Sequence, residues 1–166
     1  MTDRDQADRA RFERTYEENW LPVFRFATAW TNDRDAAEDI AQETFIRLWG
    51  HRATFDWDAH ALPWLLVTAR RLAVSRFRVL RRFLRLTVSE VTVREVAVRD
   101  GSTDMPDRWL DTSAALSRLA PRERAALMSV AVLGLSPAET GRVLGTSEGA
   151  VRALISRARK KLAEGA

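Results

Sequence analysis

The sequence has no cysteine, only two histidines, and no uncharged apolar run of about 18 residues. The lack of cysteine excludes disulfides, thiolate metal sites and cysteine nucleophiles. His51 and His60 belong to neither an HExxH motif nor a Ser/His/Asp arrangement, which argues against a metalloenzyme or a triad hydrolase. The first residues are charged and lack the apolar core of a signal peptide. These absences favour a cytoplasmic protein that spans no membrane.

Glycine and proline are also scarce, with seven and five among 166 residues, and apolar positions recur at helical spacing along most of the chain. The pattern predicts an all-α protein, with helices over residues 8–30, 35–49 and 64–85 and further helices after residue 108. Pro22 is expected to kink the first helix. The helical pattern lapses over residues 87–107, which we interpret as a flexible linker. Two small helical domains are therefore expected, at 1–86 and 108–166.

The net charge of +4 is small, but the charges are segregated along the chain. Residues 1–50 carry a net −4, whereas residues 59–89 contain seven arginines and no acidic residue. Residues 90–111 return to −3, and residues 142–162 reach +5. Basic stretches attract nucleic-acid phosphates and acidic stretches repel them, so the alternation predicts at least two kinds of partner surface. Arg76 alone projects onto the apolar side of its helix, where it must reach solvent, pair with a carboxylate or mark a break.

The C-terminal segment carries the signals of a helix-turn-helix. Pro121 can open a helix that extends to residue 133, and SPAE at 136–139 fits a capping box with proline at the first helical position. Gly145 can close this second helix, and Ser147 can cap a last helix that extends to residue 162. Two helices joined by a short glycine-containing turn are typical of DNA-binding proteins. The outward positions of the last helix include arginine, which suits guanine edges and phosphates.

The segment DAAEDIAQETFIRLW at 35–49, followed by Trp64-Leu65-Leu66 and Ala69, resembles domain two of bacterial sigma factors of the extracytoplasmic-function group. SPAE, LGTSEGAVR and RARKKL, in that order between residues 136 and 162, resemble domain four of the same group. The resemblance covers most of the chain. It implies a sigma domain two at 1–86 and a helix-turn-helix sigma domain four at 108–166.

Such proteins are not enzymes. The resemblance implies no cofactor, no metal and no small-molecule substrate. It implies a transcription initiation factor that binds core RNA polymerase, recognises promoter DNA and melts it. An anti-sigma factor, often membrane-bound, is a further expected partner, and in the holoenzyme the protein would associate with the nucleoid.

The resemblance also assigns three sets of binding residues. The polymerase-binding set is Asp39, Gln42, Glu43 and Trp49. The set for the minus-ten promoter element is Phe55, Trp57, Trp64, Arg70, Arg71, Arg78, Arg81 and Arg82. The set for the minus-thirty-five element is Ser147, Arg152, Ala153, Ser156, Arg157 and Lys160. Aromatic rings and arginines suit the second set because melted bases need stacking platforms and the strand needs cations, although Trp64 also fits a core position.

In the minus-ten part, two residues depart from the family pattern: Arg71 stands where asparagine is usual and Ser75 where aspartate is usual, so the base preference of the minus-ten loop does not carry over. In domain four, Leu154 replaces a common basic residue, and Thr140-Gly141 stands where Ile-Ala is usual. A stand-alone helix-turn-helix regulator is the alternative function, but it leaves the helix at 35–49 and the arginine-rich helix unexplained. An enzyme would need the pairs Asp33/Asp35 or Asp56/Asp58 as metal ligands, and turn chemistry explains both pairs.

Overall fold

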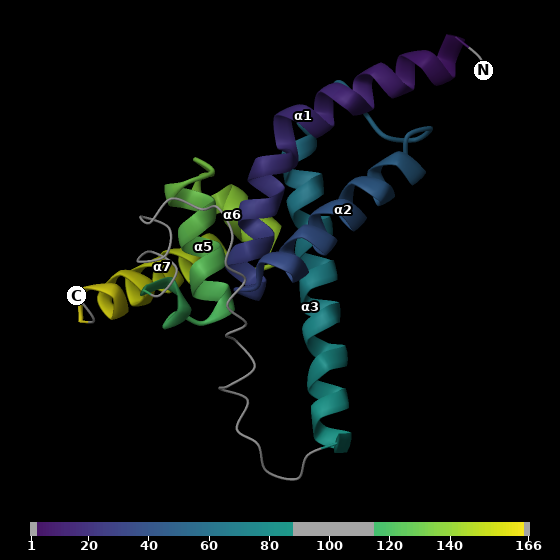
Figure 1. The fold of residues 1–166 in the computed structure, drawn as a ribbon. Coiled ribbons are helices and arrows are strands. Elements are labelled where there is room, and N and C mark those ends of the chain that lie inside the picture. Colours follow the sequence, from purple (N-terminus) through teal and green to yellow (C-terminus); the bar gives the residue numbers. More distant parts are fainter. Residues whose placement is uncertain (1–2, 88–114, 165–166) are drawn as a thin grey trace.

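The computed structural model describes residues 3–87 and 115–164, and every regular element within these ranges is helical (Figure 1). The helices are α1 (Asp3–Thr31), α2 (Arg34–Gly50), α3 (Ala61–Thr87), α5 (Pro121–Ala131), α6 (Pro137–Leu144) and α7 (Glu148–Ala163). The all-α prediction is confirmed for this part of the chain. Among the helices described, none has an apolar stretch long enough to cross a lipid bilayer.

The N-terminal half consists of α1, α2 and α3, which pack against one another around the fully buried Phe26, Leu48 and Leu65. α1 begins five residues before the expected start at residue 8 and continues through Pro22, and its ribbon bends along its length (Figure 1). Asp33 caps α2 by accepting a hydrogen bond from the Ala36 N–H at 2.9 Å. The later turns of α3 extend beyond the bundle (Figure 1), and among their described side chains Arg76, Arg78 and Arg82 are exposed.

The C-terminal half is the predicted helix-turn-helix, built from local capping signals. Ser136 and Glu139 form the expected capping box, because the serine oxygen accepts from Glu139 N–H and the glutamate accepts from Ser136 N–H. Gly145 ends α6 in the left-handed conformation, with φ of 64°. Gly141 allows α6 to approach the turn closely, since an added Cβ would lie 2.8 Å from the Thr146 carbonyl oxygen. α5 ends at Ala131, two residues before the predicted end.

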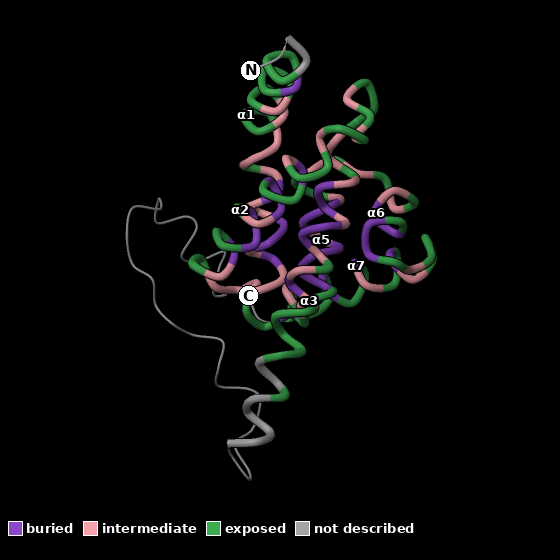
Figure 2. The backbone as a smooth tube through the Cα atoms, turned by 90° about the vertical axis from the view of Figure 1, so that its right-hand side faces the viewer, coloured by how far each residue is buried: buried purple, intermediate pink, exposed green. Residues whose placement is uncertain are grey.

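The two halves pack against each other. α5 contacts α1, α6 contacts α3, and the buried residues Phe26 and Leu65 belong to the same apolar cluster as Ala126 and Leu144. Figure 2 shows these buried segments gathered at the centre of the molecule. The domain boundaries at residues 86 and 108 stay predictions, and residues 88–107 of the predicted linker lie outside the described residues.

Candidate polymerase- and DNA-binding surfaces

The candidate polymerase-binding residues of α2 lie on its outer face, with Asp39 and Gln42 exposed and Glu43 partly exposed. Both carboxylates have arginine partners within the chain. Asp39 Oδ2 accepts from Arg76 at 2.9 Å, and Glu43 Oε1 accepts from Arg47 at 2.9 Å. Of the three options that the sequence left for Arg76, which were reaching solvent, pairing with a carboxylate and marking a helix break, the structure shows the pair with a carboxylate. The Asp39 pair also ties α2 to α3.

Trp49, the fourth candidate for polymerase binding, is partly buried and packs at the end of α2. Its ring centroid lies 5.2 Å from that of Phe12 in an edge-on arrangement, and the Arg52 guanidinium carbon lies 4.6 Å from the indole centroid. Trp49 thus fixes the end of α2 against α1 with one side while the other side carries a cation.

The three candidate aromatics for the minus-ten element lie together in and after the turn-rich segment 51–60. Phe55 has its ring centroid 5.1 Å from that of Trp57 and 5.5 Å from that of Trp64, both edge-on. All three rings are partly buried and pack against the apolar core. Trp57 Nε1–H donates to the Arg52 carbonyl at 3.2 Å, which fixes the orientation of its ring. The structure therefore brings the three aromatics together, with part of each ring accessible.

The candidate arginines of α3 differ in exposure. Arg71, Arg78 and Arg82 are exposed, whereas the side chain of Arg81 lies outside the described part. Arg70 is half-buried where α3 meets the end of α6, and its guanidinium would lie 3.4 Å from a Cβ at Gly145. Its buried Nε–H has no hydrogen-bond partner among the described residues. Burial, together with the positive charges of Arg122 and Arg71, lowers the pKa of Arg70.

The candidate minus-thirty-five residues lie on the outward face of α7, opposite its buried Val151, Ile155 and Ala158. All six candidates are exposed: Ser147, Arg152, Ala153, Ser156, Arg157 and Lys160. Ser147 has a structural task as well, since its hydroxyl oxygen accepts from the Ala150 N–H at 3.2 Å and caps α7. Arg152 bonds to Glu148 one turn earlier, with Nε 3.2 Å from the carboxylate.

Glu123 of α5 was not predicted as a functional residue, yet it contacts the basic side of α7. Its carboxylate is buried and accepts from Lys161 at 2.8 and 3.0 Å and from the Ala120 N–H at 3.0 Å, with Arg157 Nε at 3.7 Å. Burial acts to raise the pKa of Glu123, but the Lys161 and Ala120 hydrogen bonds and the charges of Lys161 and Arg157 together hold it below its usual range. The sequence contains one signal for this residue, because Glu123 is at the third helical position after Pro121, but it contains none for the partner on α7.

The aspartate pairs weighed as metal ligands have turn roles. Asp33 caps α2, and Asp56 Oδ1 accepts from the Asp58 N–H at 3.1 Å. Within the residues that the structure describes, no group of three or more histidine and acidic side chains could hold a metal ion.

Comparison with known families gives two matches. The family model described as Sigma-70 region 2 matches residues 15–83, and the model described as Sigma-70, region 4, matches residues 110–162. The first match covers the α2 face and the arginines of α3 as far as Arg82, and the second covers the helix-turn-helix.

Several curated proteins are similar along most of the chain. The chain is 31% identical over 142 residues to the ECF RNA polymerase sigma factor SigC of Mycobacterium tuberculosis, covering 84% of this chain and 75% of SigC. It is 30% identical over 167 residues to the ECF RNA polymerase sigma factor BldN of Streptomyces coelicolor, covering 98% of this chain but 63% of BldN.

A solved structure shares the fold. The sigma factor RpoE from Bartonella quintana, crystallised with the anti-sigma factor NepR, matches with a TM-score of 0.73 at 24% identity, covering 92% of this chain and 94% of RpoE.

Proposed function

Because the chain belongs to the extracytoplasmic-function group of RNA polymerase sigma factors, we propose that it binds core RNA polymerase, directs it to promoters with two DNA elements and promotes melting of the promoter. Sigma factors are not enzymes, so the action is one of binding. We also infer that it acts at the nucleoid, where polymerase and promoter DNA lie.

The outward face of α7 carries this proposal. Arg152, Ser156 and Arg157 are exposed side by side on a helix whose start is fixed by the Ser147 cap. A recognition helix presented in this way suits the major groove, where arginine binds guanine edges and small residues tolerate or contact the neighbouring bases. Run-off transcription with purified core polymerase tests the function. A promoter-specific transcript that requires this protein supports it, and its absence on every promoter of the host contradicts it.

The operator-binding regulator is not favoured, because its function uses α5 to α7 and leaves the match over residues 15–83 without a role. Both functions predict duplex binding by α7. They differ in whether DNA protection requires core polymerase. A regulator would protect its operator without polymerase, whereas the proposed sigma factor protects a promoter only together with core polymerase.

The acidic face of α2 is the proposed polymerase contact. The Asp39–Arg76 and Glu43–Arg47 pairs join side chains that are each about half exposed, with 44 to 59% of the side-chain surface accessible. Exposed pairs of this kind contribute about 0–1 kcal/mol to stability, so replacing the internal arginines with a basic partner surface costs little free energy. The pairs keep the two carboxylates apart and oriented until the partner binds.

Charge reversal tests this contact. We expect Asp39→Lys with Glu43→Lys to reduce co-purification with core polymerase at least about tenfold, because two attractions become repulsions. Glu13→Lys is the matched control, since Glu13 forms the same type of exposed pair with Arg9 on α1, at 3.0 Å. Retention of polymerase by the double variant would contradict the assignment, and loss in the control would indicate a general charge effect.

The exposed arginines of α3 and the three clustered aromatics are the proposed minus-ten surface. Stacking on Phe55, Trp57 or Trp64 would hold bases that leave the duplex, and Arg71, Arg78 and Arg82 supply positive charge along the strand. Ser75 is exposed on the same helix, so both departures from the family pattern in the minus-ten part lie where DNA could contact them.

We further infer an anti-sigma partner for this chain, as the similar RpoE of Bartonella quintana has in its complex with NepR. The acidic face of α2 is the surface for which such an inhibitor would compete with polymerase. The domain boundaries at residues 86 and 108 belong to the same proposal, with residues 87–107 connecting the two promoter contacts.

A further inference from the structure

Arginines from both halves of the chain meet at the end of α6. Arg122 Nη2, from the start of α5, donates to the Leu144 carbonyl at 3.3 Å. The guanidinium of Arg70, from α3, lies beside the next residue, where it would be 3.4 Å from a Cβ added at Gly145. Arg71 follows on α3, is exposed, and adds a third positive charge that acts on Arg70. We refer to Arg70, Arg71 and Arg122 as the arginine cluster.

The end of α6 attracts these side chains but compensates only part of their charge. The carbonyl end of a helix carries a partial negative charge of about half a unit, which favours a nearby cation. Three guanidinium groups carry three full positive charges at neutral pH, because arginine stays protonated. The cluster therefore keeps a large excess of positive charge where the two halves of the protein pack against each other.

No carboxylate balances this excess within residues 3–87 and 115–164. In these ranges Arg70, Arg71 and Arg122 form no ion pair, and the buried Nε–H of Arg70 has no hydrogen-bond partner. Glu148, three residues after Gly145, bonds instead to Arg152, at 3.2 Å from its Nε. A partly buried charged donor without an acceptor is unfavourable, so an anion that reaches it gains a strong contact.

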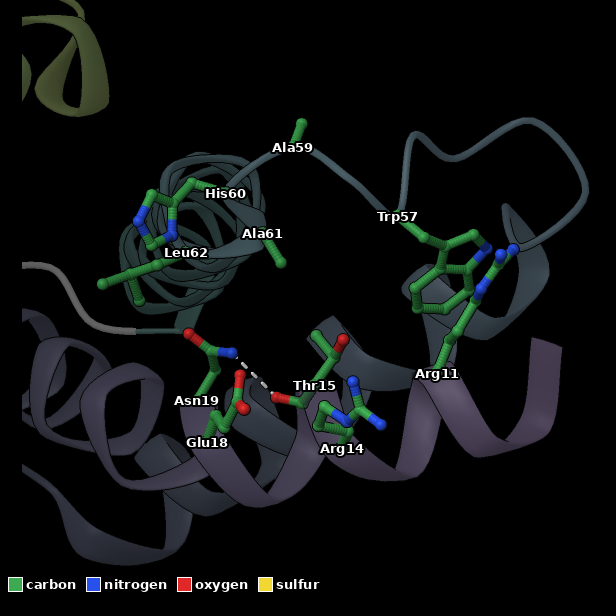
Figure 3. Close-up of a pocket in the computed structure, with 10 residues that line it drawn as sticks. All are labelled: Arg11, Arg14, Thr15, Glu18, Asn19, Trp57, Ala59, His60, Ala61 and Leu62. Carbon is green, nitrogen blue, oxygen red and sulfur yellow. Dashed lines mark hydrogen bonds between the residues drawn. The ribbon is translucent and has the colours of Figure 1, made fainter. Parts of the chain in front are cut away.

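The arginines of α1 have different surroundings. Arg9 pairs with Glu13 at 3.0 Å, and Arg14 lines the cleft between α1 and the segment before α3 together with Glu18 (Figure 3). An anion approaching α1 would meet these carboxylates. At the arginine cluster it would meet only guanidinium groups and the unpartnered N–H donor among the described side chains.

We propose that the arginine cluster binds a small anion of the diphosphate class, which bridges the two halves of the protein. The guanidinium fork matches phosphate oxygens in pairs. One phosphate group carries about 1.5–2 negative charges at pH 7, so two linked groups suit three guanidinium groups better than one does. Arg70 and Arg71 belong to the N-terminal half and Arg122 to the helix-turn-helix, so the bound anion holds α3 to α5 and α6.

The site concerns the chain alone and does not depend on the proposed function. It does bear on that function, because Arg70 and Arg71 belong to the minus-ten set. An anion bound there occupies side chains that promoter DNA would contact, and DNA phosphates would compete with it.

Isothermal titration of the full chain with pyrophosphate, at constant pH and ionic strength, tests the site. Arg70→Gln and Arg122→Gln should each weaken binding of pyrophosphate at least about tenfold, because each removes a charge-assisted hydrogen bond. At about 100 times its dissociation constant, pyrophosphate should raise the midpoint of thermal unfolding of wild type by about 5–10 °C. The same concentration should raise the midpoint of either variant much less.

Arg78→Gln on α3 and Arg159→Gln on α7 are the matched controls, since both change exposed arginines outside the cluster. Each should keep the affinity for pyrophosphate within about twofold of wild type, because exposed charges at a distance are screened at this ionic strength. Circular dichroism establishes that all four variants are folded.

The outcomes are decisive for the site and leave the transcription test of the proposed function separate. Equal weakening in the controls and the cluster variants would show diffuse attraction and overturn the proposal. Weakening by Arg70→Gln but not by Arg122→Gln would show that the anion does not bridge the halves, and would overturn it too. If pyrophosphate does not bind while a short single-stranded oligothymidylate binds through Arg70 and Arg122, the cluster is a contact for DNA backbone phosphates and the small-anion site is refuted.

Discussion

α5 packs against α7 with one face and against α1 with the other, and each contact contains a buried ionised side chain. Glu123 faces α7 and Arg124 faces α1, with 4% and 7% of their surfaces exposed. Glu123 is compensated by Lys161 and Arg157. Arg124 has no acidic partner among the described residues, and its guanidinium donates instead to the carbonyls of Ala29 at 2.8 Å, Leu119 at 2.7 Å and Leu116 at 3.5 Å.

The two contacts differ in how the buried charge is compensated: by opposite charges at Glu123 and by backbone carbonyls at Arg124. The Glu123 contact compensates charge inside the helix-turn-helix and holds α7 against α5. Of the acceptors of Arg124, only Ala29 belongs to the N-terminal half, at the last turn of α1, where the helix dipole favours a cation. If the halves separate, Arg124 loses one hydrogen bond, keeps two, and can be hydrated. Burial lowers the pKa of Arg124 in the packed state because its guanidinium is desolvated. Separation of the two halves would relieve this desolvation.

The largest expected effect is that of Arg124→Ala. The change removes a charged donor from three buried or partly buried carbonyls, and we expect the free energy of unfolding to fall by about 3 kcal/mol. Urea unfolding followed by circular dichroism measures it. Arg159→Ala, an exposed arginine of α7, is the control and should change stability by less than about 0.5 kcal/mol. A loss for Arg124→Ala no larger than that of the control would break the comparison, because the contact between the halves would then not depend on this side chain.

A smaller effect is expected for Glu123→Gln, about 1–2 kcal/mol at pH 7, because Lys161 is half exposed and can be rehydrated after the carboxylate is lost. The pKa of Glu123 is lower in the folded protein than in the unfolded chain. Its stabilisation is therefore fully present above the unfolded value of about 4.3 and is lost as pH falls through the folded value.

The difference in the free energy of unfolding between wild type and Glu123→Gln should consequently become smaller below about pH 4. Urea unfolding at pH 7 and at pH 3.5 measures this change. Glu164→Gln is the control, since Glu164 pairs with Lys160 only at 3.8 Å and both side chains are exposed. A deficit that does not depend on pH would show that packing, rather than charge, holds α7 to α5.

The same comparison shows what the sequence could and could not predict. Local signals predicted the Ser136 and Ser147 caps, the Gly145 end of α6 and the outward face of α7, because each depends on residues within one or two turns. Helical spacing also predicted that Arg76 lies on a different face from the other arginines of its helix. The structure agrees, because Arg76 faces α2 and pairs with Asp39 there. The start of α1 was missed by five residues because its first turns are charged and have no apolar period.

The sequence could not predict contacts between distant segments. Arg124 is 95 positions from Ala29, and Glu123 is 38 from Lys161, so no periodicity connects either pair. In the sequence, Glu123 and Arg124 are two charges in a helix start, where exposure is the usual state. Arg70 was grouped with the exposed arginines for the same reason, although α6 covers it. Helical spacing predicts on which face of its helix a residue lies, whereas burial of that residue depends on which other helix packs against that face.

The smallest expected effect concerns Arg70, at the second contact between the halves. Its buried Nε–H has no partner in the part of the chain that the structure describes, and the charges of Arg122 and Arg71 oppose its own, so this contact contains a cation that burial destabilises. Arg70→Gln should therefore leave the free energy of unfolding unchanged or raise it by up to about 0.5 kcal/mol, while weakening binding of promoter DNA by holoenzyme. Arg78→Gln, an exposed change on the same helix, should weaken DNA binding without any gain in stability. A loss of more than about 1 kcal/mol for Arg70→Gln would mean that Arg70 holds α6 to α3. Both arginines would then stabilise the contact between the halves, whereas we expect Arg124 to stabilise it at α1 and Arg70 to destabilise it at α6.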